Sequence, residues 1–177
     1  MTRTVWHCHI AVSLDGKIAP PDGRFDWLAN HPPEEFGIDA FLASVDGILM
    51  GRETYDVVRR FGAWPYADKQ TVVMTHRALP DAPPGVETRS GDLGAVAAEL
   101  EARGCRRVWI EGGGQVIREM IAADRFDVLE MAVIPIVLGD GIPLFPPGTP
   151  ELDLRLASCT PRSRGALHLV YEVVRAA

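Results

Sequence analysis

One stretch decides the fold of this chain: Arg107-Val108-Trp109-Ile110-Glu111-Gly112-Gly113-Gly114-Gln115-Val116-Ile117. Its apolar first part has the composition of a buried strand, and a helical pattern follows the three glycines. Glycines let a ligand approach the backbone closely, and the free N–H groups at the start of a helix attract an anion. The stretch therefore predicts a strand, a turn and a helix that bind a phosphate group, with a plain tight turn as the alternative.

A second junction of the same kind lies earlier in the chain. Ile48-Leu49-Met50 has the pattern of a short strand, and Gly51-Arg52-Glu53-Thr54-Tyr55 leads from it into a helical pattern. Two helix starts suited to anions indicate a long ligand with several phosphates. The glycine run departs from the usual dinucleotide fingerprint G-x-G-x-x-G, because Ile117 stands at its last position. This departure disfavours a standard Rossmann domain.

Length and composition narrow the class of protein. The chain has 177 residues, of which 47% are hydrophobic and 24% charged, and this predicts a single globular domain over residues 1–177. The formal net charge of −6 argues against a general nucleic-acid binder. Cys8, Cys105 and Cys159 are scattered along the chain. This spacing favours cysteines that serve as small apolar residues in a reducing compartment, and it argues against a disulfide framework. No signal-peptide pattern or bilayer-length apolar stretch is visible, so we expect a cytoplasmic protein.

The rest of the chain alternates strands with helices. A breaker-rich loop at 13–23 follows the first strand and is expected to carry function. The alternation predicts an α/β fold in which a mixed, mainly parallel central sheet is flanked by helices and ends in antiparallel strands. Strands are expected at 4–12, 47–50, 71–75, 107–111, 128–134, 136–138, 152–157 and 166–174, and helices with a buried stripe at 38–45, 54–61, 93–100 and 116–121.

Four motifs, taken in order, carry a resemblance to a known family. They are Ala11-Val12-Ser13-Leu14-Asp15-Gly16-Lys17-Ile18-Ala19, Met50-Gly51-Arg52-Glu53-Thr54-Tyr55, Ile110-Glu111-Gly112-Gly113-Gly114 and Val137-Leu138-Gly139-Asp140-Gly141-Ile142-Pro143-Leu144-Phe145. Over nearly the whole chain they resemble the dihydrofolate reductase superfamily, nearest the branch that contains the reductase domain of riboflavin biosynthesis and its stand-alone relatives. The resemblance implies a dihydrofolate-reductase-like sheet, NADPH as the cofactor and a homodimer.

The resemblance also implies a set of cofactor-binding residues. The first strand and its loop would face the nicotinamide, and the two glycine junctions would approach the phosphates from opposite sides. The residues after the strand at 71–75 would flank the adenine and the 2′-phosphate, where an arginine suits a phosphate well. The residues concerned are Ala11, Ile18 and Ala19, then Gly51, Arg52 and Thr54, then Thr75, His76 and Arg77, and finally Gly112, Gly113, Gly114, Gln115 and Val116.

Three acids are candidates for delivering a proton to the substrate. Glu35 lies near the position of the carboxylic acid in folate-reducing members, and Asp39 is the neighbouring alternative. Ordinary first-turn acids that favour the helix dipole are the competing interpretation of both. Glu111, immediately before the glycines, resembles the acid of the riboflavin-pathway branch and stands at the end of a parallel strand, where ligands bind in open α/β sheets.

Substrate-binding residues are expected in the first loop and just after it. The resemblance implies Lys17 as a partner of Glu111 in binding a ribityl-type substrate, with Asp15 beside it and Trp27 as a distant counterpart of a folate-reductase tryptophan. The sequence therefore predicts an NADPH-dependent reductase that transfers a hydride to a flat heterocyclic acceptor, either pterin-like or ribityl-pyrimidine-like. A non-catalytic nucleotide-binding or regulatory module that retains the cofactor cleft is the alternative.

Two further expectations concern metals and oligomers. His7 and His9 share a strand face, but no third ligand is evident in the sequence, so no metal site is expected. The apolar residues around the turn at 139–141 exceed what a small domain hides and predict a homodimer interface near that turn. Gly113 is likewise expected to be required, because a side chain there would intrude on the phosphates or on an unusual backbone geometry.

Overall fold

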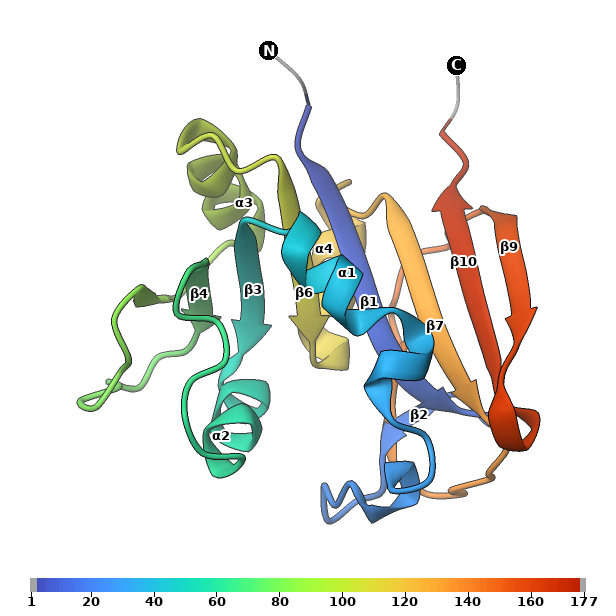
Figure 1. The fold of residues 1–177 in the computed structure, drawn as a ribbon. Helices are drawn as coiled ribbons and strands as arrows, with labels where there is room; N and C mark the ends of the chain where they lie inside the picture. The colour runs from blue at the N-terminus through green and yellow to red at the C-terminus, as the bar shows by residue number, and fades with distance from the viewer. Residues whose placement is uncertain (1–2, 176–177) are drawn as a thin grey trace.

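A computed structural model describes residues 3–175 and contains an eight-stranded sheet with helices on both faces (Figure 1). The strand order is β5-β4-β3-β6-β1-β7-β10-β9. The strands are β1 (Val5–Ser13), β3 (Gly47–Gly51), β4 (Gln70–Met74), β5 (Val86–Arg89), β6 (Arg107–Gly112), β7 (Val128–Ile134), β9 (Leu154–Pro161) and β10 (Leu167–Val173), while β2 (Lys17–Ala19) and β8 (Ile142–Pro143) form a separate pair. The helices are α1 (Ile38–Ser44), α2 (Arg52–Arg60), α3 (Leu93–Ala102) and α4 (Gly114–Ala122), with short 3₁₀ helices η1 (Asp26–Leu28), η2 (Pro33–Phe36) and η3 (Ser163–Gly165).

Most strands of the sheet are parallel, and only the strands from the C-terminal part of the chain are antiparallel. β5, β4, β3, β6, β1 and β7 are paired in parallel, whereas β10 pairs antiparallel with both β7 and β9. This confirms the predicted α/β class. The central strands β3 and β6 are buried on both faces, which explains their continuous apolar runs.

Alternating side chains divide the core into two layers. Trp109 packs with α1 and α2 on one face, together with Phe41 and Tyr55. Ile110, the next residue along β6, points to the other face and packs with α3 and α4, where Met120 is also buried. None of the helices within residues 3–175 is long and apolar enough to cross a membrane.

Two predicted elements differ from the observed ones. The segment 136–138 is not a strand, because its backbone groups bond to the first loop: Leu14 N–H donates to the Ile136 carbonyl, and the Leu138 N–H donates to the Asp15 carboxylate. The helix predicted at 38–45 ends one residue earlier, as α1, and Gly37, with a φ of +75°, separates it from the short helix η2.

The edge of the sheet also corrects one expectation. β9 is the last strand, and its residues from Arg155 to Pro161 are exposed. Cys159 lies on this strand and is therefore exposed, unlike the buried Cys8 and Cys105. The prediction of a small apolar core residue is wrong for this cysteine.

The carboxyl ends of the parallel strands meet at one side of the sheet, which is where ligands bind in open α/β folds.

Candidate functional site

A cleft of about 1350 Å³ lies at the carboxyl ends of the parallel strands. It gathers nearly every residue that was assigned to the cofactor, from segments far apart in the sequence. Those that line it are Ala11, Ile18, Ala19, Gly51, Arg52, Thr54, Thr75, His76, Arg77, Gly113, Gly114, Gln115 and Val116. Gly112 is buried directly behind this surface.

The two helix starts converge in this cleft. Helix α2 begins after Gly51 and helix α4 after Gly113, and neither cap makes a side-chain hydrogen bond. A Cβ atom placed on Gly51 would lie 3.4 Å from Val116 Cγ2, so the starts of the two helices are in contact. Unpaired N–H groups of both helices therefore serve the same region of the cleft, as an extended ligand with more than one phosphate requires.

The three glycines of the run have different roles. Gly112 has a φ of +104°, which disfavours any side chain. A Cβ atom on Gly114 would lie 2.5 Å from the Pro143 carbonyl oxygen. Gly113 has an ordinary φ of −69°, and its added Cβ would make normal contacts of 3.8 Å with Ile18 Cδ1 and 4.0 Å with Thr54 Oγ1. Of the two predicted reasons for a glycine here, a positive φ is not observed, whereas the missing side chain leaves the cleft open between Ile18 and Thr54.

The two predicted phosphate-binding arginines differ in availability. Arg52 Nε donates to both carboxylate oxygens of Asp56, at 2.8 and 2.9 Å, and Arg52 Nη1 lies 3.4 Å from the Ala78 carbonyl oxygen. These contacts tie the start of α2 to the loop after β4. The guanidinium of the exposed Arg77 has no hydrogen-bond or ion-pair partner among residues 3–175, so it is free to contact an anion.

Glu111 ends β6 in the cleft with an unusual carboxyl group. Its Oε1 accepts a hydrogen bond of 2.8 Å from the Tyr66 hydroxyl. Its Oε2 is buried and has no hydrogen-bond partner in the described part of the chain. Burial raises the pKa of Glu111 to about 8, although the Tyr66 hydrogen bond acts to lower it. A pKa in this range favours the protonated acid at pH 7.

The other two acids lie outside the cleft. Glu35 Oε2 accepts a hydrogen bond of 2.7 Å from Ser163 Oγ, which links η2 to η3. Asp39 is exposed in the first turn of α1, a usual place for an acid because of the helix dipole. Neither acid lines the cleft that contains Glu111.

The residues expected to bind the substrate serve mainly as scaffold. Asp15 accepts hydrogen bonds from Ser13 Oγ at 2.6 Å and from the N–H groups of Leu138 and Gly139, and these bonds hold its pKa at about 2. Trp27 is buried in a small core cluster next to β7. Neither residue lines the cleft, and nor does Lys17 on β2.

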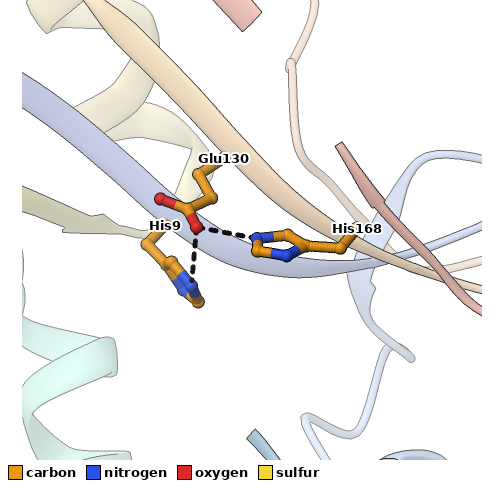
Figure 2. A group of neighbouring side chains, drawn as sticks. All are labelled: His9, Glu130 and His168. Atoms are coloured by element: carbon orange, nitrogen blue, oxygen red, sulfur yellow. Dashed lines mark hydrogen bonds and ion pairs between the residues drawn. The ribbon is translucent and has the colours of Figure 1, made fainter. Parts of the chain in front are cut away.

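Sequence reasoning missed several residues that the fold brings into the cleft. Tyr66 lies in a loop without a local signal, and His9 was considered only with His7 as a possible metal ligand. Trp109 Nε1 donates to the His9 carbonyl oxygen at 3.1 Å, and both residues line the cleft. Figure 2 shows that Glu130 from β7 and His168 from β10 join His9 on the same face of the sheet.

Comparison with known proteins agrees with this architecture. The family model of the RibD C-terminal domain matches residues 6–168. The chain belongs to the RibD C-terminal domain family. The chain is 39% identical over 152 residues to the uncharacterized protein YwjB of Bacillus subtilis (strain 168). The aligned region covers 84% of this chain and 86% of YwjB.

Solved structures extend the likeness. A putative riboflavin biosynthesis protein from Shewanella sp. PV-4 has a TM-score of 0.86 and 31% identity, covering 97% of this chain and all of that one. A dihydrofolate reductase from Enterococcus faecalis, complexed with NADP(H) and RAB-propyl, has a TM-score of 0.67 and 20% identity, covering 98% and 99%, and shares the fold. The RibD C-terminal match and the Shewanella structure support a protein of the riboflavin-pathway reductase type, and the Enterococcus faecalis structure supports the dihydrofolate-reductase-like fold.

Proposed function

We propose that this protein is an NADPH-dependent reductase that transfers a hydride to a flat heterocyclic acceptor. The observation that carries the proposal is the neutral carboxylic acid of Glu111, which stands in the same cleft as two converging helix starts. Hydride transfer to a carbon–nitrogen or conjugated double bond also requires one proton. The cleft combines a place for a dinucleotide with a group that holds that proton.

The residues of the cleft fit NADPH along its length. The starts of α2 and α4 would hold the pyrophosphate, and the open backbone at Gly113 leaves room for it. The free guanidinium of Arg77 would contact the 2′-phosphate, while Ala11 and Ile18 would lie against the nicotinamide. When bound, NADPH supplies the hydride. The Enterococcus faecalis reductase, complexed with NADP(H), supports this choice of cofactor.

Glu111 would give its proton from Oε2 to the acceptor atom next to the carbon that is reduced. The acceptor then gains one hydride and one proton, and Glu111 becomes a carboxylate. The Tyr66 hydroxyl, at 2.8 Å from Oε1, stabilises that carboxylate by donating a hydrogen bond to it. A proton from solvent restores the acid after each turnover.

The decisive experiment measures turnover and binding separately. NADPH oxidation is followed with a panel of pterins, quinones, nitro compounds and ribityl-pyrimidines, and NADPH binding is titrated beside it. Glu111→Gln should bind NADPH normally and lose at least about a hundred-fold in turnover, the usual contribution of a general acid. Glu34→Gln, an exposed acid outside the cleft, is the control. NADPH binding without turnover of any acceptor would instead indicate a nucleotide-binding module.

We further propose that two copies of the chain associate. Within the apolar C-terminal group, Ile134 and Leu144 are buried in the protomer, but Val137 remains 68% exposed, Phe145 41% and Ile142 37%. Exposed apolar side chains on both sides of the turn at 139–141 in the sequence favour an interface between copies near that turn. Light scattering at micromolar concentration tests this: a mass of 19.3 kDa, that of one chain, would contradict it.

A further inference from the structure

The histidine cluster consists of His7, His9 and His168 around the carboxyl group of Glu130, three members of which appear in Figure 2. Glu130 on β7 is paired with His9 on β1, so both side chains share one face of the sheet. His168 Nε2 lies 2.7 Å from Glu130 Oε1, and His7 Nε2 lies 2.9 Å from Glu130 Oε2. Burial acts to raise the pKa of Glu130, but the surrounding histidines lower it to about 2. A carboxylate therefore stands at the centre of the cluster.

Two arginines contact the cluster from outside. Arg107 Nη1 lies 3.2 Å from His7 Nδ1, and Arg162 Nη2 lies 3.0 Å from His168 Nδ1. A guanidinium only donates hydrogen bonds, so these contacts need an unprotonated Nδ1 and leave the N–H of each ring at Nε2, on the side of Glu130. Both rings are thus held at two ends, by a donor and by an acceptor.

His9 connects the cluster to η2. Its Nε2 lies 3.0 Å from the carbonyl oxygen of Phe36 and 3.6 Å from Glu130 Oε1. A carbonyl oxygen only accepts hydrogen bonds, so His9 Nε2 carries a proton and donates it to Phe36. Burial lowers the pKa of His9, although the charge of Glu130 acts to raise it, and the neutral ring is favoured at pH 7. The single N–H of this ring is therefore used to hold η2.

The rings of the cluster also pack against the segment that covers them. The ring of Phe41 on α1 has its centroid 4.7 Å from that of His7 and 4.8 Å from that of His9. The ring of Phe36 on η2 meets His168 edge-on, with centroids 5.9 Å apart. Hydrogen bonding and ring packing thus both fix η2 and α1 relative to the sheet.

η2 forms one wall of the cleft, at its nicotinamide end. Pro33 and Phe36 line the cleft, and so do Ile38 and His9. Phe36 belongs to the same apolar cluster as Ala11, which is expected to lie against the nicotinamide. An acceptor has to approach the nicotinamide closely to receive a hydride. It would therefore lie against the wall that η2 provides.

We propose that the histidine cluster positions η2, and with it the wall of the acceptor site. Glu130, His7 and His168 do not line the cleft, so they act on it through His9, which does. Glu130 is a positioning residue: its charge attracts His9 and holds the other two rings beside it, and His9 in turn holds the Phe36 carbonyl group. The inference rests on the proposed function, because that function supplies the acceptor.

The arrangement fits positioning better than a metal ion, although ligand atoms of His9, Glu130 and His168 lie within 4.8 Å of one another. A metal would need the Nε2 lone pairs, where the contacts described above place protons. Metal-binding histidines donate their second N–H to a carboxylate or a carbonyl oxygen, whereas His168 Nδ1 faces the guanidinium of Arg162.

Hydrogen exchange followed by mass spectrometry tests the positioning without any ligand. Glu130→Gln keeps the size of the side chain, but its amide N–H₂ meets one of the histidine N–H groups, donor to donor. Exchange in peptides that cover residues 33–44 should become about ten-fold faster, the value of one hydrogen bond, while α3 at 93–102 exchanges as in the wild type. Glu172→Gln, the same change at an exposed acid on β10, is the control and should leave both segments unchanged.

A pair of variants at His9 tests the same link from its other end. His9→Phe leaves the Phe36 carbonyl group without its donor and should also speed exchange at 33–44. His9→Gln places a side-chain amide N–H near the former position of Nε2 and should restore slow exchange. This pair decides the question if Glu130→Gln does not fold. Wild-type exchange at 33–44 in His9→Phe, or equally fast exchange in both His9 variants, would overturn the proposal.

Kinetics tests whether the wall serves the acceptor. With an acceptor that the wild type reduces, Glu130→Gln should raise its KM about ten-fold and change kcat and the Kd of NADPH by less than about two-fold, because an apolar wall contributes binding and not proton transfer. An unchanged KM would overturn the proposal, as would stoichiometric binding of Co²⁺ that His168→Ala removes. NADPH binding without turnover of any acceptor would contradict only the proposed function, and the exchange experiments would still decide whether the cluster positions η2.

Discussion

Replacing Glu111 by Gln should change how stability depends on pH. The pKa of Glu111 rises from an ordinary value of 4.5 to about 8 in the folded protein, because burial penalises the charged form. A raised pKa means that the folded state binds the proton more tightly than the unfolded state. Its stabilising effect is fully present below pH 4.5 and is lost as the pH rises towards 8. Glutamine keeps the shape of the acid without a titrating proton.

The size of this effect follows from the pH interval between the unfolded and folded pKa values of Glu111. Each pH unit between the two pKa values changes the free energy of unfolding by about 1.4 kcal/mol, and the whole window by about 5 kcal/mol. Urea unfolding of both proteins at half-unit steps of pH measures it. The difference between wild type and Glu111→Gln should move in favour of the variant as the pH rises, and it should become constant above pH 8. A difference that does not vary with pH would refute the neutral acid.

Turnover should report the same pKa. With an active acceptor, kcat/KM of the wild type should be constant below pH 7 and fall about ten-fold per unit above pH 8, because only the protonated acid gives a proton. Tyr66→Phe removes the hydrogen bond that favours the carboxylate, so it should move the alkaline limb to higher pH by about one unit. A limb that stays in place in this variant would show that Tyr66 does not act on Glu111.

Three further outcomes are expected. Gly113→Ala should fold with wild-type stability and lose NADPH affinity. Gly114→Ala should lower the melting temperature, because its Cβ collides with a carbonyl oxygen. Equal stability of the two variants would contradict this difference. Arg77→Ala should weaken NADPH binding about ten-fold or more and leave NADH binding unchanged, whereas Arg52→Ala should affect the binding of both cofactors alike. An equal loss of affinity for both cofactors in Arg77→Ala would show that Arg77 does not contact the 2′-phosphate. Asp15→Asn should be less stable than wild type above pH 4, and the difference in stability should become smaller as the pH falls towards 2, where Asp15 becomes protonated. Thermal unfolding that shows the same difference at every pH would contradict the anchoring role of Asp15.

The cofactor half of the site could be predicted because each part of it is local in the chain. Gly51 and Gly113 stand where a buried strand ends and a helical pattern begins, and such a junction positions its own N–H groups regardless of the rest of the fold. Parallel strands then bring the junctions together. The sequence left open which of two reasons requires a glycine at position 113, because the contacts of an added Cβ depend on Ile18 and Thr54 from other elements.

The acceptor half could not be predicted in the same way, because its contacts join distant parts of the chain. Tyr66 and Glu111 are 45 residues apart, and Glu130 and His168 are 38 apart. No periodicity or spacing records such a meeting. The candidates Glu35 and Asp39 come from the resemblance, and the structure places them elsewhere: Glu35 bonds to Ser163, Asp39 is exposed, and neither lines the cleft.

The sequence by itself determined the α/β alternation, the two anion-binding helix starts and the family, because these depend on hydrophobic periodicity and on glycines at fixed offsets. Only the tertiary structure decided the chemistry of the site. Burial by surrounding elements raises the pKa of Glu111, and the Tyr66 hydroxyl reaches its carboxyl group from another segment. Desolvation and such hydrogen bonds are properties of a packed environment, and a packed environment exists only after distant segments have met.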